Sequence, residues 1–214
     1  MHCFITGTGT DVGKTFVTRL MLRALVAAGH RAVGYKPVAC GDRDDAKALL
    51  ADGFPGPSLD EINPIFLPVA AAPFVATSLG HATVDVGKAI EGFRHLAATY
   101  DHVLVEGAGG WEVPLVAGRT VGDLAADLQL PVVVVVDNRL GALNHTILTV
   151  NAIRARGLKC AGLILNHLAD ERDTASITNR AILEEWLQIP VLQDILHQES
   201  ETDAEWILDL LRTT

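Results

Sequence analysis

The sequence predicts an α/β protein in which a mainly parallel β-sheet carries helices on both faces. Three observations support this fold class. Short runs rich in β-branched residues alternate with longer segments of helical period, as in successive βαβ units. The most apolar run, PVVVVV at residues 131–136, is typical of a central strand that is buried on both faces. A glycine-rich turn, GTGTDVGKT at residues 7–15, directly follows the first run and opens a helix.

The alternation continues along the whole chain. The β-branched and apolar runs predict strands at residues 2–6, 31–37, 102–106, 131–136, 160–166 and 190–193. The segments of helical period predict helices at residues 16–29, 46–50, 85–100, 120–128, 142–157, 175–187 and 203–211.

One stretch, residues 53–73, is rich in proline and glycine and has no regular pattern. We expect it to be a loop that acts as a lid or faces a partner. Because no fixed-period repeat and no linker between domains is visible, the chain is expected to form a single domain of residues 1–214.

Composition and charge exclude several classes of function. The chain of 214 residues is 49% hydrophobic and 20% charged, which indicates a folded globular protein. A net charge of -9 without a long lysine or arginine run argues against a nucleic-acid partner. The longest apolar run is much shorter than the roughly 20 residues that span a bilayer, so no membrane partner is expected.

The cysteines and the N-terminus indicate a cytoplasmic location. The three cysteines are far apart, odd in number and without metal-ligand spacing, which argues against disulfides and zinc sites and fits a reducing compartment. The N-terminus runs straight into a strand and has no basic segment of the signal-peptide type.

The tetrapeptide Asp-Val-Gly-Lys occurs twice, and its neighbours separate the two copies. The first, residues 11–14, lies between a strand and an amphipathic helix, which is the setting of a phosphate-binding loop. The second, residues 85–88, has no strand before it and has Ala89 where the hydroxyl residue should be. We therefore expect Asp85 to cap a helix and Lys88 to be solvated.

The first copy has the chemistry that phosphates require. Its glycines let successive amides point inward, and the start of the helix adds a partial positive charge. Lys14 can bridge the outer phosphates, and the hydroxyl of Thr15 can bind Mg²⁺. The loop is the longer G-x5-GKT form, because Gly7 stands one position earlier than the usual glycine, which Thr8 replaces.

Other polar residues follow predicted strands, at the edge of the sheet where open α/β proteins bind ligands. Lys36 is either a solvated strand end or a cation for a transferring phosphoryl group. Glu106 opens a GAGG turn and is suited to holding Mg²⁺, although it could be only a polar strand end. Asp45 belongs to an acidic cluster before a helix, and by sequence alone a capping role is favoured. Asn166 could contact a purine edge or form an Asx turn.

Two further features bear on the site. The segment LGALNHT opens a helix at residues 141–144, whose free amides could receive a carboxylate. Cys40 has no paired histidine or asparagine, so it is expected to be a small wall residue and not a nucleophile.

Five separated motifs resemble those of the dethiobiotin synthetase family, in the same order along nearly the whole chain. They are GTGTDVGKT, GYKPVACG, VEGAGGW, LGALNHT and GLILN. The resemblance implies a seven-stranded parallel P-loop fold and a homodimer. It also implies Mg²⁺-dependent and ATP-dependent closure of a ureido ring on 7,8-diaminononanoate with CO2. The products would be dethiobiotin, ADP and phosphate.

The resemblance also implies roles for individual residues. Lys14 and Lys36 would be catalytic, and Thr15, Asp45 and Glu106 would organise Mg²⁺. The nucleotide would contact Asp11, Val12, Gly13, Lys14, Thr15, Phe16, Asp45, Glu106, Gly107, Ala108, Gly109 and Asn166. The diamine would contact Thr10, Lys36, Cys40 and Glu106, and its carboxylate would contact Gly141, Ala142, Leu143 and Asn144 of the second subunit. The chain departs from the family pattern at Gly9, at Cys40 and at residues 195–197, where an Ile-Pro turn is usual.

Two other classes of P-loop protein are less well supported. Switch ATPases of the chromosome-partitioning or division-site type carry a signature lysine, but Gly9 occupies its position here. Their membrane-binding relatives end in a basic amphipathic helix, whereas the last residues here, EWILDLLRTT, are acidic apart from Arg212. A related amidoligase domain would need an additional glutaminase module, for which 214 residues are expected to leave no room.

Overall fold

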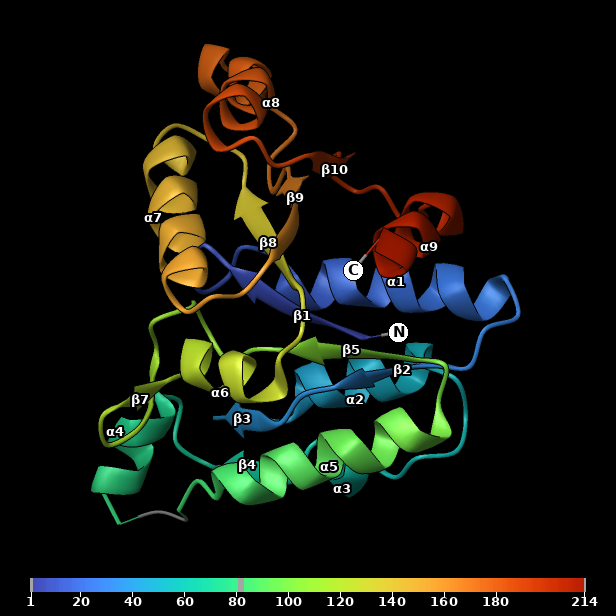
Figure 1. Cartoon of the computed structure of the whole chain (residues 1–214), viewed down its shortest axis with the longest axis vertical. Coiled ribbons are helices and arrows are strands. Elements are labelled where there is room, and N and C mark those ends of the chain that lie inside the picture. The colour runs from blue at the N-terminus through green and yellow to red at the C-terminus, as the bar shows by residue number, and fades with distance from the viewer. Residues whose placement is uncertain (1, 81–82, 214) are drawn as a thin grey trace.

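A parallel six-stranded sheet forms the centre of the molecule in this computed structural model, which describes residues 2–80 and 83–213 (Figure 1). The predicted domain also includes positions 1, 81, 82 and 214, which lie outside the described residues. The strand order is β10-β9-β8-β1-β5-β2, and every neighbouring pair is parallel. The strands are β1 (His2–Gly7), β2 (Ala32–Tyr35), β5 (His102–Glu106), β8 (Val132–Asp137), β9 (Cys160–Asn166) and β10 (Val191–Ile195).

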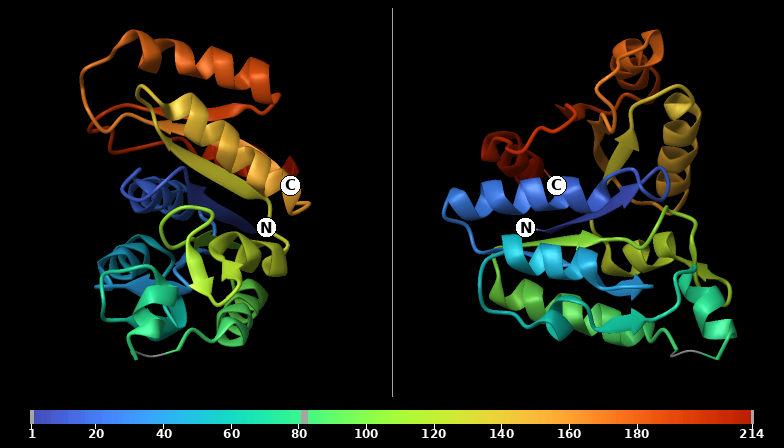
Figure 2. Two further views of the ribbon diagram at one scale, coloured as in Figure 1. Left: turned by 90° about the vertical axis from the view of Figure 1, so that its left-hand side faces the viewer. Right: turned by 180° about the vertical axis from the view of Figure 1, so that it is seen from behind.

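Helices cover both faces of this sheet, as the sequence predicts (Figure 2). One face carries α1 (Lys14–Ala27), α2 (Asp44–Asp52) and α9 (Ala204–Thr213). The other face carries α5 (Val86–Thr99), α6 (Val121–Leu128), α7 (Ala142–Ala155) and α8 (Thr174–Leu187). Both cores contain apolar side chains from the same strands, because successive side chains of a strand point to opposite faces.

The sheet has six strands over the described part of the chain, so the expected number of seven is wrong. The residues after β2 do not extend the main sheet. Instead, β3 (Val38–Cys40) pairs in parallel with β4 (Ile65–Leu67) in a separate two-stranded sheet. Pro37 stands between β2 and β3 and has no backbone N–H to offer to a ladder, which fits a break at this point.

The stretch 53–73 is more ordered than the sequence pattern indicates. It contains a short helix, α3 (Leu59–Ile62), as well as β4, and another short helix, α4 (Pro73–Ser78), begins at its end. Ser58 and Glu61 form a reciprocal capping box that defines the start of α3. Ile62 and Leu67 are fully buried, so the middle of the stretch belongs to the core. A small hairpin of β6 (Pro114–Val116) and β7 (Arg119–Thr120) completes the strands of the described residues.

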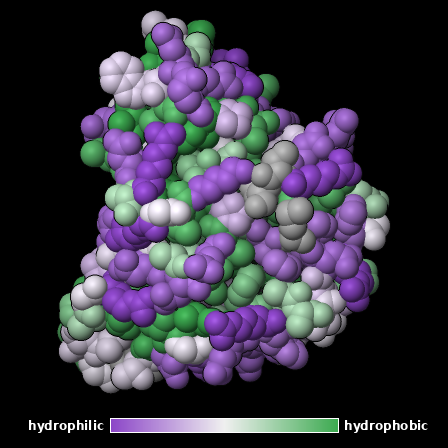
Figure 3. Space-filling model, viewed as in Figure 1, coloured by the Kyte–Doolittle hydropathy of each residue, from purple (hydrophilic) through white to green (hydrophobic). Residues whose placement is uncertain are grey.

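The predicted central strand is buried along nearly its whole length. Residues 132–136 are all valines with no exposed surface, and β1 and β9 lie on either side of them. Hydrophilic residues cover most of the face drawn in Figure 3, with smaller hydrophobic patches between them. None of the helices in residues 2–80 and 83–213 is both long and apolar enough to cross a membrane.

The second Asp-Val-Gly-Lys copy has the structural role that the sequence predicts. Asp85 is the N-cap of α5, and its carboxylate accepts a hydrogen bond from the backbone N–H of Lys88. The side chain of Lys88 is exposed and donates to the carbonyl of Pro64. The partly buried side chains of Val86 and Ile90 pack against the core. The first copy, in contrast, connects β1 to α1 at the carboxyl end of the sheet.

Candidate active site

The loop between β1 and α1 has the form of a phosphate cradle. Gly13 is the N-cap of α1, with a φ of 88°, a left-handed value that a residue with a side chain rarely adopts. A Cβ added at Gly13 would lie 2.1 Å from Nδ2 of Asn166, so the position is closed to other residues by contact as well. Because the first N–H groups of a helix have no partner within the helix, the start of α1 can receive phosphate oxygens.

Lys14 is the first residue of α1 and directly follows Gly13 of this loop. Its side chain is largely buried, and its Nζ donates to the carbonyl of Gly9 at 3.1 Å. Burial and the neighbouring charge of Lys36 lower the pKa of Lys14, and the carboxylates of Glu106 and Asp45 partly oppose that shift. An anion in the loop would relieve both unfavourable effects on the ammonium group.

Two of the predicted site residues bond Glu106 at the end of β5, and a third bonds one of those two. In the parallel pairing of β1 with β5, Glu106 lies opposite Ile5, two residues before the end of β1. Its Oε1 accepts hydrogen bonds from Oγ1 of Thr15 at 2.7 Å and from Nζ of Lys36 at 2.6 Å. Lys36 also donates to Oδ2 of Asp45 at 2.8 Å. Residues from four separate elements or connections therefore form one charged cluster.

The pKa directions in this cluster follow from burial and charge pairing. Burial disfavours the ammonium form of Lys36, but the carboxylates of Glu106 and Asp45 outweigh it and raise the pKa of the lysine. Burial acts to raise the pKa of Asp45, but the charge of Lys36 and the hydrogen bond that it donates lower this pKa overall. Lys36 and Asp45 are therefore both charged at neutral pH.

The second carboxylate oxygen of Glu106 is left over. Oε2 is buried and has no hydrogen-bond partner among residues 2–80 and 83–213, and the residue as a whole has 0% exposed surface. Such an atom is costly to bury unless something else binds it. Mg²⁺ prefers oxygen ligands, and it commonly uses one or two carboxylates together with substrate phosphates and water. Thr15, Asp45 and Glu106 fit that donor set, although the described residues contain no group of three or more histidines, cysteines or carboxylates around one point.

A cavity of about 440 Å³ opens beside the cluster. Its wall includes the predicted substrate residues Thr10, Lys36 and Cys40, together with Asp45. Burial raises the pKa of the Cys40 thiol, which fits its expected role as a wall residue. Lining residues that the sequence did not indicate are Val38, Ala39, Asp42, Ala70, Ala71, Ala72, Pro73 and Val113. Of these residues, the run of small side chains at Ala70–Ala72 followed by Pro73 is a sequence pattern that could have indicated a wall packed close to a ligand.

The glycine-rich turn after Glu106 completes this wall. Ala108 and Gly109 line the cavity. Gly109 has a φ of 66°, and a Cβ there would come within 2.9 Å of Val113 and 3.5 Å of the hydroxyl of Thr10. The turn therefore packs directly on the phosphate loop, so the cavity and the loop share a boundary.

Two predicted contacts lie elsewhere. Asn166 ends β9 and is buried, and its Nδ2 donates to the carbonyl of Val12 at 3.0 Å. It therefore holds the backbone of the phosphate loop, a role that the sequence did not indicate. The start of α7, residues 141–144, does not line the cavity beside Lys36 within the described chain.

In this parallel sheet β1 leads into a phosphate loop, and the carboxylate at the end of the neighbouring β5 pairs with the lysine that follows β2. These features define a P-loop protein of the nucleotide-binding class. A family profile described as "AAA domain" matches residues 2–205. Solved structures agree on the fold, at identities too low to indicate more. The chain superposes on a MinD cell division protein of Aquifex aeolicus with a TM-score of 0.60 and 17% identity, covering 99% of this chain and 95% of that one.

A second solved structure is similar to the same degree. It is the cobyrinic acid a,c-diamide synthase of Mycobacterium smegmatis with bound ADP and magnesium, at a TM-score of 0.57 and 15% identity, covering 99% of this chain and 95% of that one.

Curated relatives are far more similar in sequence. The ATP-dependent dethiobiotin synthetase BioD of Akkermansia muciniphila is 46% identical over 207 residues, which is 97% of each chain. That of Xylella fastidiosa is 42% identical over 202 residues, which is 91% of this chain and 89% of the relative. The chain belongs to the dethiobiotin synthetase family.

The geometry of Gly13 generates a prediction. Gly13→Ala should lower the free energy of unfolding by about 1–2 kcal/mol through left-handed strain, and should weaken ATP binding more than tenfold because the new methyl group displaces Asn166. Urea unfolding and titration calorimetry with ATP measure the two effects.

Gly29→Ala is the matched control. Gly29 has a φ of 87° but no atom within 4 Å of its added Cβ, so this variant should show the strain and keep the affinity for ATP. Equal affinities in the two variants would contradict the role given to the contact with Asn166.

Proposed function

We propose that the chain is a dethiobiotin synthetase that acts in the cytoplasm. It closes a ureido ring on 7,8-diaminononanoate with CO2 and ATP, and releases dethiobiotin, ADP and phosphate. Two sets of observations support this: the 46% and 42% identical relatives, and the arrangement of the site. The three cysteines of the chain are free, as in a reducing compartment.

The observation that carries the proposal is the position of Lys36. Its ammonium group donates hydrogen bonds to Glu106 and Asp45, and Lys36 borders the cavity. Glu106 also accepts a hydrogen bond from Thr15, which links Lys36 to the residues at the end of the phosphate loop. A fixed cation there can serve both the phosphate that is transferred and an anion bound in the cavity. A protein that only hydrolyses ATP has no need of a second, substrate-sized cavity at this place.

The proposed reaction has three steps. One amine of the substrate adds to CO2 and loses a proton, which gives a carbamate. A carbamate oxygen attacks the γ-phosphate, the bond to ADP breaks, and a mixed carbamic-phosphoric anhydride forms. The second amine attacks the carbamate carbon and loses a proton, the bond to phosphate breaks, and the ring closes. Little covalent work falls to the protein, so orientation and charge stabilisation carry the rate.

The chain's own residues divide this work. Lys14 binds the outer phosphates, and Lys36 stabilises the negative charge of the carbamate and of the transferring phosphoryl group. The amides of residues 11–16 hold the phosphates, residues 106–109 border the nucleotide and the diamine, and Asn166 contacts the adenine. Thr10 and Cys40 form the wall against the diamine.

Thr15, Asp45 and Glu106 would hold Mg²⁺. The unpartnered Oε2 of Glu106 supports this assignment, because that atom needs a partner in the buried site. When bound, the ion neutralises charge on the phosphates. The hydroxyl of Thr15, which donates to Glu106, would turn to offer its lone pairs instead.

The substrate carboxylate would bind the start of α7 of a second subunit, at residues 141–144. Two leucines beside this segment support a homodimer, since Leu140 is 76% exposed and Leu148 is 60% exposed.

Sedimentation should give a mass twice that of the chain, and Leu148→Asp should yield monomers that have lost most of the diamine-dependent turnover. A monomeric wild type with full turnover would refute the shared site.

The proposed function has a direct test. Phosphate release from ATP should require the diamine and bicarbonate together, and either alone should give only a small background rate. Lys14→Ala should abolish this release, whereas Lys88→Ala, in the second Asp-Val-Gly-Lys copy, should keep the wild-type rate within twofold because its side chain is exposed and bonds the backbone carbonyl of Pro64. ATP hydrolysis that is indifferent to the diamine would favour a switch ATPase instead.

A further inference from the structure

The backbone of Lys36 is held by the stretch that the sequence pattern predicts to be irregular. β2 ends at Tyr35 and β3 begins at Val38, so Lys36 lies where the chain leaves the main sheet. Its N–H donates to the carbonyl of Ile62 at 2.9 Å, and its carbonyl accepts from Nδ2 of Asn63 at 2.7 Å. Residues 62–63 therefore hold the lysine from both sides of its Cα.

Asn63 is itself fixed. Its residue is only 2% exposed, and its side-chain amide bonds three different partners. Nδ2 donates to the carbonyls of Lys36 and of Ile65, the latter at 3.1 Å, and Oδ1 accepts from Nε of Arg43 at 2.9 Å. A buried amide with all of its partners in place has one favourable orientation, because turning it would leave donors and acceptors unpaired.

Arg43 joins Asn63 to the helix that carries Asp45. Its guanidinium also donates to the carbonyls of Leu59 and Asn63, each at 2.9 Å, and to Oδ1 of Asp60 at 2.8 Å. Arg43 is the N-cap residue of α2, and Asp45 lies in the first turn of that helix. One arginine thus connects the start of α2 to the asparagine that holds Lys36.

We propose that Arg43 and Asn63 are positioning residues that fix Lys36 and Asp45 relative to Glu106. The inference rests on the proposed function, in which Lys36 acts on the carbamate and the phosphate. A lysine side chain is long and flexible, so its ammonium group is directed only if the root of the side chain and its partners are both held. Displacement of a reacting group by about 1 Å can slow a reaction on the order of 100-fold.

Neither Arg43 nor Asn63 is among the described residues that line the cavity, so the effect of changing them can be separated from a loss of cavity contacts. Loss of positioning should lower kcat far more than it changes the KM for ATP, because the contacts of the phosphate loop are unchanged and Asp45 is only one of the groups proposed to hold Mg²⁺. If a residue serves only general stability, its substitution would lower the melting temperature without lowering kcat selectively over the KM for ATP.

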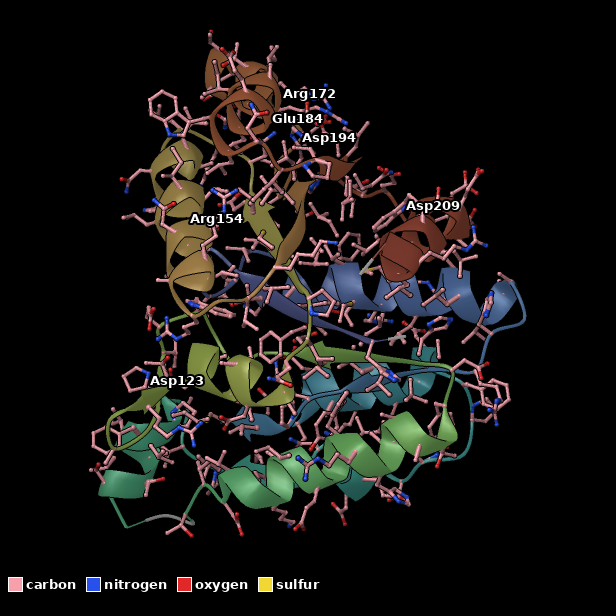
Figure 4. All side chains as sticks on the ribbon, viewed as in Figure 1. Asp123, Arg154, Arg172, Glu184, Asp194 and Asp209 are labelled. Carbon is pink, nitrogen blue, oxygen red and sulfur yellow. The ribbon has the colours of Figure 1, made fainter. Side chains whose placement is uncertain are left out.

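The test uses Arg43→Met and Asn63→Leu, which keep much of the side-chain bulk and remove the hydrogen bonds. Each should lower kcat about 30-fold to 100-fold and leave the KM for ATP within about twofold. Arg43→Lys keeps one cationic donor and should recover about a tenth of the wild-type kcat or more. Arg154→Met is the matched control: Arg154, on α7, bonds the carbonyl of Leu187 and lies across the molecule from α2 and β3 (Figure 4).

The outcomes are distinguishable. A kcat for Arg43→Met and Asn63→Leu equal to that of Arg154→Met, or a KM for ATP that rises in step with the loss of kcat, would overturn the inference. If Asn63→Leu fails to fold, the kcat and KM of Arg43→Met test the inference. That variant is expected to fold, because the side chain of Arg43 is partly exposed at the surface.

A crystal structure of Arg43→Met tests the geometry without any assay. The inference predicts that Nζ of Lys36 and Oδ2 of Asp45 move beyond about 3.5 Å of each other, and an unchanged contact would overturn it. If wild-type phosphate release is indifferent to the diamine, the proposed function fails on its own, and this structure still decides whether the pair positions Lys36.

Discussion

The rest of the site depends on the buried charge of Glu106. A carboxylate with no exposed surface is unfavourable unless it is paired, and its partners here are the ammonium group of Lys36 and the hydroxyl of Thr15. These two contacts, from Lys36 and from Thr15 to Glu106, bring the end of β5, the end of β2 and the first turn of α1 together. The raised pKa of Lys36 means that its stabilising contribution is present below the ordinary pKa of lysine and is lost as the pH rises through the folded value.

This pairing is possible because the sheet is parallel. β5 lies between β1 and β2, so the phosphate loop, Glu106 and Lys36 emerge at the same edge of the sheet. Asp45 joins them because α2 starts close to that edge. Among the described residues, the carboxylate of Glu106 uses only one of its two oxygens, and in the proposed function the other would bind a cation that arrives with the nucleotide. The site therefore combines a structural ion pair with an incomplete ligand set.

The sequence was sufficient for the parts that depend on local pattern. The strands, the phosphate loop and the helix cap at Asp85 each follow from residues within a few positions of one another. The meeting of Lys36 with Glu106 could also be expected, since both end strands. The link from Arg43 through Asn63 to Lys36 could not be expected from the sequence. It joins positions up to 27 apart through a buried side-chain amide, and such a contact produces no periodic pattern in the sequence. The contact between Asn166 and Val12 spans 154 positions and is equally invisible. The role proposed for residues 141–144 involves a second subunit, so no contact within one chain could reveal it.

A double-mutant cycle on Lys36 and Glu106 tests the central claim most directly. Lys36→Met alone should cost about 3–5 kcal/mol of unfolding free energy, because it leaves the carboxylate buried without its partner. Adding Glu106→Gln should restore most of that loss, since the buried charge is removed, while turnover stays absent in both variants. Destabilisations that simply add, or a Lys36→Met enzyme with near-normal turnover, would contradict the account.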